Sequence, residues 1–89
     1  MGRLEDKVAI VTGGARGLGR VFCMAFAEEG AKVVIADILH EEAEQTAREI
    51  RDKGGSSLSI KVDVSSEEET NRMAEATVKE FGRIDILVN

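Results

Sequence analysis

The sequence contains no tyrosine, no tryptophan and no proline, and its single cysteine is Cys23. One cysteine cannot form an internal disulfide or a zinc site, so the sequence predicts a protein of the reducing cytoplasm. No apolar run approaches the roughly 20 residues that span a bilayer, and no basic-then-apolar signal segment opens the chain. From these absences we expect no membrane partner and no metal site.

Positive charge is also scarce. The 89 residues carry 12 basic and 17 acidic side chains, for a net charge of −5. A nucleic-acid surface needs a basic patch that displaces counterions, so this balance excludes nucleic acid as a partner. The hydrophobic content of 43% suffices for one globular domain over residues 1–89. A chain this short buries only roughly 60–65% of its unfolded surface, so we expect modest stability.

Several segments are typical of β-strands, and they are expected over residues 7–11, 32–37, 58–62 and 84–88. Most are short apolar runs, as in strands buried on both faces. In contrast, Leu58, Ile60 and Val62 alternate with polar residues, as in a strand with one wet face. The segment 58–62 is therefore predicted at an edge of the sheet.

Helices are predicted between these strands. The first, over residues 18–29, is indicated by the helical spacing of Leu18, Phe22, Ala25 and Phe26. The second is expected over residues 41–53. The third follows the overlapping capping boxes at Ser65 and Ser66 and closes at Gly82.

Strands joined by single helices favour a parallel sheet with right-handed crossovers. The pattern predicts an α/β fold, the first half of a Rossmann-like doubly wound parallel sheet, with the succession β-α-β-α-β-α-β and strand order 3-2-1-4. The last strand, Ile86-Leu87-Val88, is as apolar as a central strand, and an exposed apolar edge invites aggregation. We therefore expect these residues to be the front part of a longer polypeptide.

A glycine-rich segment, Thr12-Gly13-Gly14-Ala15-Arg16-Gly17-Leu18-Gly19, lies where the first strand becomes the first helix. A helix N-terminus presents unpaired N–H groups and partial positive charge, and glycines let phosphate oxygens approach the backbone. This placement favours a phosphate-binding loop over a mere tight turn. Arg20-Val21 stand where a Walker loop needs Lys and Ser/Thr, so the NTPase interpretation is excluded.

Asp37 ends the second predicted strand, 18 residues after Gly19. A carboxylate there can accept hydrogen bonds from both hydroxyls of an adenosine ribose, and it repels a 2′-phosphate. The alternative is an Asp that only forms a turn at the strand end. Arg16 favours the opposite preference, because a guanidinium in the loop can reach a 2′-phosphate. NAD is the favoured cofactor, and NADP is the less favoured one.

The motifs together resemble the opening of a short-chain dehydrogenase/reductase. The resemblance rests on Thr-Gly-x-x-x-Gly-x-Gly after Lys-Val-Ala-Ile-Val, on Asp37, on Asp63-Val64, and on Gly-Arg-Ile-Asp-Ile-Leu-Val-Asn at residues 82–89. The last residues resemble the start of the family's Leu-Val-Asn-Asn-Ala-Gly segment, cut after its first Asn. The match covers nearly the whole chain and implies its N-terminal, NAD(P)-binding portion.

The resemblance implies two groups of cofactor-binding residues. The pyrophosphate and the adenosine ribose would be lined by Gly13, Gly17 and Gly19 with the backbone of Ala15, Arg16 and Leu18. The second group is Asp37 on the ribose hydroxyls, Ile38 beside the adenine, Asp63 accepting from its amine, Val64 against the ring, and Asn89 on a cofactor ribose through its backbone. Alternatively, Asp63 only shapes the turn into the third helix, and Asn89 is a frayed terminus.

The resemblance also implies an NAD-dependent oxidoreductase that moves hydride between nicotinamide and a small alcohol or ketone. The family's catalytic Ser, Tyr-x-x-x-Lys pair and Asn lie beyond the cofactor half, with the Tyr as acid/base and the Lys lowering its pKa. This chain has no tyrosine, so no catalytic residue is assigned and the 89 residues alone are predicted to be inactive. For the complete enzyme the resemblance implies a homo-oligomer, a tetramer or dimer.

Two other functions stay open at this point. One is a non-catalytic dinucleotide-binding module or truncated gene product. The other is an S-adenosylmethionine-dependent methyltransferase, which fits the glycine spacing less well. The remaining reactive side chains have ordinary interpretations, because His40 is expected to be solvated and Cys23 to pack as a small hydrophobe.

Overall fold

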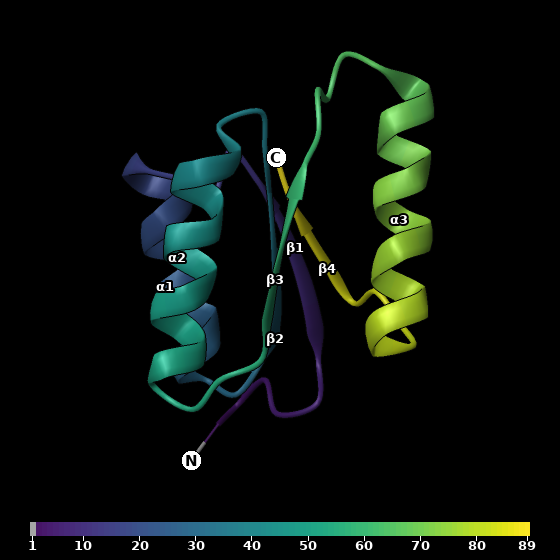
Figure 1. The fold of residues 1–89 in the computed structure, drawn as a ribbon. Coiled ribbons are helices and arrows are strands. Elements are labelled where there is room, and N and C mark those ends of the chain that lie inside the picture. Colours follow the sequence, from purple (N-terminus) through teal and green to yellow (C-terminus); the bar gives the residue numbers. More distant parts are fainter. Residues whose placement is uncertain (1) are drawn as a thin grey trace.

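A computed structural model describes residues 2–89 as a parallel β-sheet with helices on both faces (Figure 1). Strands and helices alternate along the chain, in the order β1 (Val8–Thr12), α1 (Gly17–Glu28), β2 (Lys32–Asp37), α2 (His40–Asp52), β3 (Ser57–Lys61), α3 (Glu67–Phe81) and β4 (Ile86–Val88). The strand order is β3-β2-β1-β4, with every neighbouring pair parallel. The predicted fold class and strand order are confirmed.

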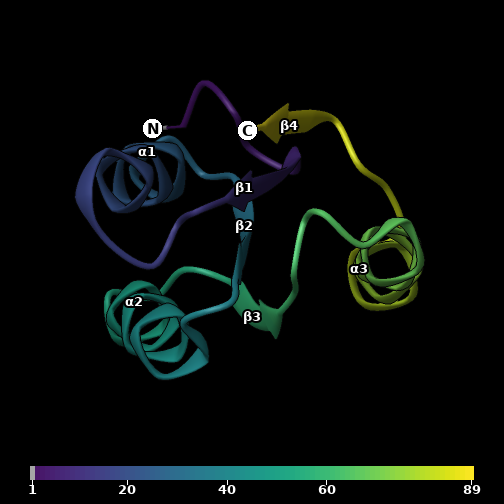
Figure 2. The same ribbon diagram turned by 90° about the horizontal axis from the view of Figure 1, so that it is seen from above.

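The helices form two layers around the sheet. Figure 2 shows α1 and α2 side by side on one face and α3 on the other. Because side chains alternate along a strand, the buried residues divide accordingly. Val11, Val33 and Ile35 pack with α1 and α2, and Ile10 and Val34 pack in the cluster that contains Met73 of α3.

The buried face of α1 differs from the apolar row seen in the sequence. In α1 the buried residue is Cys23, whereas Leu18 is 68% exposed and Phe22 37%. Gly14 lies so near that a Cβ built on it would come 2.8 Å from the Cys23 Sγ. In α3, Met73 and Thr77 are buried. In α1, helical spacing therefore identified the helix but not the row that faces the sheet.

The parallel register brings the carboxyl ends of all the strands to one edge of the sheet. Thr12 at the end of β1 pairs with Ala36, and Asp37 at the end of β2 pairs with Lys61. On the other side, Val11 pairs with Val88, directly before Asn89. The glycine segment, Asp37, Asp63 and Asn89 therefore all lie at or just after the ends of strands at this edge. Within residues 2–89, no helix is long and apolar enough to cross a membrane.

Candidate functional site

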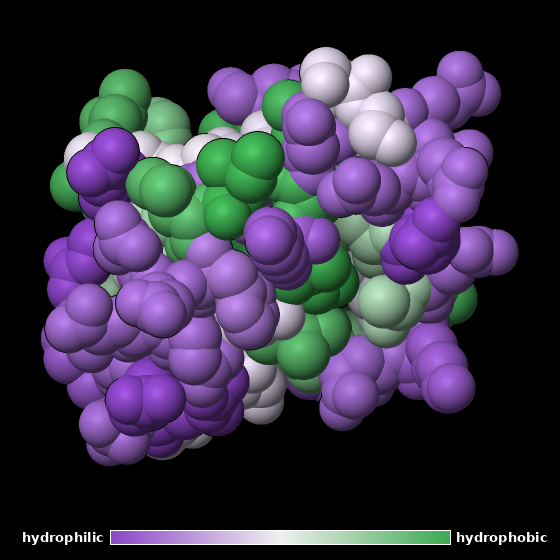
Figure 3. Space-filling model, turned by 45° about the horizontal axis from the view of Figure 1, so that its top comes forward, coloured by the Kyte–Doolittle hydropathy of each residue, from purple (hydrophilic) through white to green (hydrophobic). Residues whose placement is uncertain are grey.

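A cavity of about 350 Å³ opens at the carboxyl edge of the sheet. It is lined by Thr12, Gly13, Ala36, Asp37, Ile38, Val62, Asp63, Val64 and Asn89. In Figure 3, with this edge turned toward the reader, apolar surface lies in the middle of the molecule between hydrophilic surfaces. Doubly wound sheets bind ligands at the carboxyl edge, next to the strand at which the order of the strands in the sheet reverses direction. Here β1 is that strand, flanked by β2 and β4.

The glycine loop, residues 13–19, begins beside this cavity and leads into α1. Gly13 and Gly17 have φ angles of 71° and 63°, a left-handed region that side chains with a Cβ rarely adopt. Gly19 is required for a different reason, because a Cβ there would lie 2.1 Å from the carbonyl oxygen of Gly13. The glycines therefore permit both the turn of the loop and the close approach of α1 to it.

The N-terminus of α1 is open to an anion. Its N-cap is Arg16, whose backbone is extended, and within the described residues no side chain caps the helix. The first N–H groups of a helix have no partner inside it. The first turn also holds no acidic residue. Backbone donors and the positive end of the helix dipole thus point out of the loop, as a phosphate site requires.

Asp37 connects the end of β2 to the glycine loop. Its Oδ2 accepts a hydrogen bond from the Ala15 N–H at 3.1 Å, and its Oδ1 accepts one from the Leu39 N–H at 3.0 Å. The turn role and a binding role are therefore compatible, since each carboxylate oxygen has a second lone pair. The carboxylate is held at the cavity wall with acceptor capacity to spare.

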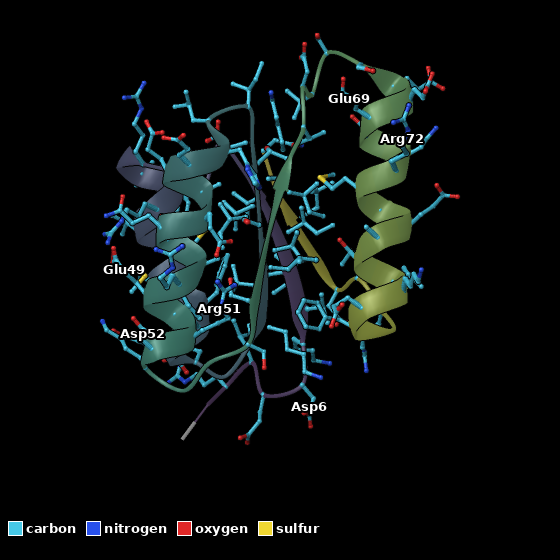
Figure 4. The ribbon with its side chains drawn as sticks, viewed as in Figure 1. Asp6, Glu49, Arg51, Asp52, Glu69 and Arg72 are labelled. Atoms are coloured by element: carbon cyan, nitrogen blue, oxygen red, sulfur yellow. The ribbon has the colours of Figure 1, made fainter. Side chains whose placement is uncertain are left out.

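Asp63 lies two residues after the end of β3. Its Oδ1 accepts hydrogen bonds from the Ser65 Oγ at 2.6 Å and the Ser65 N–H at 2.9 Å, and these bonds lower the pKa of the Asp63 carboxyl. The Asp63 N–H donates to Glu69, which lies on the first turn of α3 (Figure 4). Glu69 thus completes this turn, while its own N–H donates to the N-cap Ser66.

Two exposed aliphatic side chains flank the same cavity. Ile38 is 57% exposed and follows Asp37, and Val64 is 60% exposed and follows Asp63. Exposed branched side chains that line a cavity suit a flat ring, with the neighbouring polar groups fixing its orientation.

Thr12 is a site residue to which the sequence analysis gave no role. Its Oγ1 donates to the Val88 carbonyl at 3.1 Å and lies 3.4 Å from the Asn89 Oδ1. The hydroxyl therefore joins the ends of β1 and β4 and sets Asn89 at the cavity. A threonine at a strand end is common, and its partners lie 76 and 77 residues away, so local sequence carries no signal for the contact.

The structure brings most of the predicted site together. Gly13, Asp37, Ile38, Asp63, Val64 and Asn89 line the cavity. Ala15, Arg16, Gly17, Leu18 and Gly19 lie in the adjoining loop and the first turn of α1. Cys23 lies beneath the loop, and burial raises its pKa to about 12, so the side chain is a neutral thiol as expected of a packing residue.

Comparison with known families agrees with this geometry. The model of the short chain dehydrogenase family matches residues 7–89. The chain belongs to the short-chain dehydrogenase family. This membership confirms the resemblance seen in the sequence.

Individual short-chain dehydrogenases and related proteins match over the same region. The uncharacterized oxidoreductase YxbG of Bacillus subtilis is 44% identical over 89 residues, all of this chain and 33% of that protein. The 2,5-dichloro-2,5-cyclohexadiene-1,4-diol dehydrogenase LinX of Sphingobium indicum is 47% identical over 87 residues, 98% of this chain and 35% of LinX. This short-chain dehydrogenase chain thus spans about one third of the length of such relatives.

A solved structure shows the same arrangement with a dinucleotide present. The 7α-hydroxysteroid dehydrogenase complexed with NADH and 7-oxo glycochenodeoxycholic acid superposes with a TM-score of 0.95 at 38% identity. The superposition covers 98% of this chain and 34% of that one. The short-chain dehydrogenase fold described above is therefore shared with a protein whose structure was solved in complex with NADH.

Proposed function

We propose that the chain is the cofactor-binding portion of an NAD-dependent oxidoreductase that transfers hydride between nicotinamide and an alcohol or ketone. The observation that carries the proposal is Asp37, whose carboxylate lies at the wall of the cavity and contacts the glycine loop. Family membership and the NADH complex of a relative support it. When bound, the dinucleotide supplies the hydride chemistry, and the protein supplies binding and orientation.

Each part of the site has a proposed task. The pyrophosphate is bound at the open N-terminus of α1, by Gly13, Gly17 and Gly19 with the backbone of Ala15, Arg16 and Leu18. The adenosine is bound in the cavity, with Asp37 on the ribose hydroxyls, Ile38 and Val64 on either side of the adenine, and Asp63 accepting from its amine. Asn89, fixed by Thr12, contacts a cofactor ribose through its backbone.

The preference for NAD over NADP follows from charge. Asp37 carries a negative charge at the place proposed for the ribose, and a 2′-phosphate there would be repelled. Its hydrogen bonds from Ala15 and Leu39 hold the carboxylate in place. Arg16 is exposed at the N-cap of α1, and in the structure Asp37, not Arg16, lines the cavity.

The proposal for the 89 residues by themselves is binding without turnover. The family's acid/base tyrosine is implied to lie beyond the cofactor-binding half, and this sequence contains no tyrosine. A non-catalytic dinucleotide-binding module is therefore the second candidate function. For the complete protein we propose a cytoplasmic homo-oligomer, a tetramer or dimer, acting on a small alcohol or carbonyl compound.

The test is a titration of the chain with NADH, NADPH and S-adenosylmethionine. Calorimetry measures the binding of all three ligands, and nicotinamide fluorescence also reports the binding of NADH and NADPH. We expect NADH to bind at least several-fold more tightly than NADPH and S-adenosylmethionine not to bind. Tighter binding of NADPH would overturn the NAD assignment, and binding of S-adenosylmethionine alone would overturn the dehydrogenase assignment. Oxidation of NADH by a carbonyl substrate on the isolated chain would contradict the proposal of binding without turnover.

A further inference from the structure

Ala15 is held from two sides by side chains of other elements. Its N–H donates to the Asp37 Oδ2 at the end of β2, at 3.1 Å. Its carbonyl accepts from the Thr46 Oγ1 on α2, at 3.3 Å. Ala15 is 3% exposed and Thr46 is 1% exposed. The centre of the glycine loop is thus fixed from two sides, by a buried contact with α2 and by a partly buried contact with the carboxylate at the cavity wall.

The carbonyl of Ala15 depends on Thr46 for its hydrogen bond. Ala15 lies outside the regular helices and strands, and among residues 2–89 no backbone N–H donates a hydrogen bond to its carbonyl oxygen. A buried carbonyl without a partner loses its hydrogen bonds to water and gains none in the protein, which costs folding free energy, and such groups are rare in native proteins. Thr46 therefore satisfies a group that the fold of the loop would otherwise leave unpaired.

The geometry of the Thr46 hydroxyl supports a role outside its own helix. Its single hydrogen is shared between the Ala15 carbonyl at 3.3 Å and the Glu42 carbonyl, one turn earlier in α2, at 3.2 Å. Thr77 in α3 is buried as well, but its Oγ1 donates within the helix, to Met73 at 2.8 Å. Thr46 thus makes a longer bond inside its helix while also reaching the loop.

Holding this carbonyl also orients a donor. In a trans peptide the C=O and the N–H of the same plane point in opposite directions. The carbonyl of Ala15 points toward Thr46 on α2, so the N–H of Arg16 in the same peptide points away from α2. Arg16 is the N-cap of α1, and its peptide leads into the turn that presents the open N–H groups of the helix.

We propose that Thr46 is a positioning residue for the glycine loop, which its hydroxyl holds in the form that receives a dinucleotide. The proposal rests on the proposed cofactor function. Asp37 lines the cavity and sets the preference between dinucleotides, whereas Thr46 is absent from the cavity wall. Loss of the Thr46 hydroxyl therefore lowers the affinities for NADH and for NADPH by the same factor, because both dinucleotides carry the pyrophosphate that the loop is proposed to bind.

The experiment compares Thr46→Val, which has the same shape without the donor, with Thr46→Ser, which keeps the hydroxyl. Titration of the chain should show Thr46→Val weakening both dinucleotides about three- to tenfold with their ratio unchanged, the effect of one hydrogen bond. Thr46→Ser should bind like the wild type. Thr77→Val, which removes a buried threonine hydroxyl from the other face of the sheet, is the matched control and should leave both affinities unchanged.

Wild-type affinities in Thr46→Val would overturn the proposal, and so would an equal loss in Thr46→Ser or Thr77→Val. If Thr46→Val does not fold, Thr46→Ala, which also removes the donor, replaces it with the same expectation. If the wild type binds neither dinucleotide, the proposed function fails, and the Thr46 contact is then tested without ligand. Relative to the wild type, the amide ¹⁵N and ¹H chemical shifts of Arg16 should change in Thr46→Val and stay the same in Thr46→Ser. Unchanged shifts in Thr46→Val would overturn the proposal that Thr46 positions the loop.

Discussion

The Oδ2 of Asp37 accepts a hydrogen bond from the N–H of Ala15 at 3.1 Å, across a sequence separation of 22 residues. The side chain proposed to choose between NAD and NADP therefore also supports the glycine loop. A substitution at Asp37 changes two things at once, the charge at the proposed ribose site and the support of the loop.

Replacing Asp37 separates these two effects. Asp37→Asn removes the charge and keeps an oxygen that can accept from Ala15, so it should narrow the gap between the NADH and NADPH affinities by relieving the repulsion of the 2′-phosphate and by weakening the hydrogen bonds to the ribose hydroxyls of NADH. Asp37→Ala also removes the support of the loop, so it should narrow the gap and weaken both dinucleotides further, with NADH losing about tenfold or more. Calorimetric titration of both variants measures this, and an unchanged ratio in both would contradict the charge argument.

Gly19 is expected to tolerate no side chain. In Gly19→Ala the Cβ would meet the Gly13 carbonyl oxygen at 2.1 Å, so the loop and α1 must separate. Overpacking of this kind costs about 1–3 kcal/mol or more of unfolding free energy, and NADH binding should fall with it.

Val21→Ala is the matched control for this change. Val21 is 59% exposed on the same helix, and its replacement should stay within about 0.5 kcal/mol of the wild type. Urea unfolding of both variants gives the comparison. Equal stability of Gly19→Ala and Val21→Ala would show that the loop and helix are not in close contact.

The turn after β3 should have a pH signature. Hydrogen bonds from Ser65 hold the pKa of Asp63 below its ordinary value. A lowered folded-state pKa contributes stability that is complete above the ordinary aspartate range and disappears as the pH falls through the lowered value. In Ser65→Ala we expect the pKa of Asp63 to rise toward that of a free aspartate, measured by ¹³C NMR of the carboxyl group.

Ser59→Ala serves as the reciprocal control. The Ser59 Oγ donates to Glu44 at 2.6 Å and is the largest cause of the lowered pKa of that glutamate. This variant should therefore raise the pKa of Glu44 and leave that of Asp63 unchanged. If Ser65→Ala left the Asp63 titration unmoved, the turn would not have the geometry described.

Local sequence patterns were enough to predict most of the fold of this chain. The apolar run before Asp37 predicts a strand over residues 32–37, and β2 is Lys32–Asp37. The alternation at Leu58 and Ile60 correctly predicted that β3 is an edge strand. These features depend on residues close in sequence, so they can be read without the rest of the molecule.

Features that depend on distant residues could not be read in this way. The apolar spacing of α1 did not reveal that Cys23, not Leu18, faces the sheet, because that choice depends on how close Gly14 and Gly19 let the helix come. The contact of Thr46 with the loop spans 31 residues, and nothing near Thr46 in sequence marks it. The cofactor roles of the individual site residues stay predictions for the titrations above.

The free edge of β4 gives the last prediction. β4 is an outer strand of this sheet, and Leu87 at its centre is 55% exposed. An apolar strand edge is a template for pairing with another chain, so the 89-residue chain should self-associate, and Leu87→Lys should reduce this association. Val78→Lys is the control, because Val78 is 47% exposed and lies on the helix α3, not on a strand. Light scattering measures both variants, and a stable monomer of the unmodified chain would show that the β4 edge does not pair.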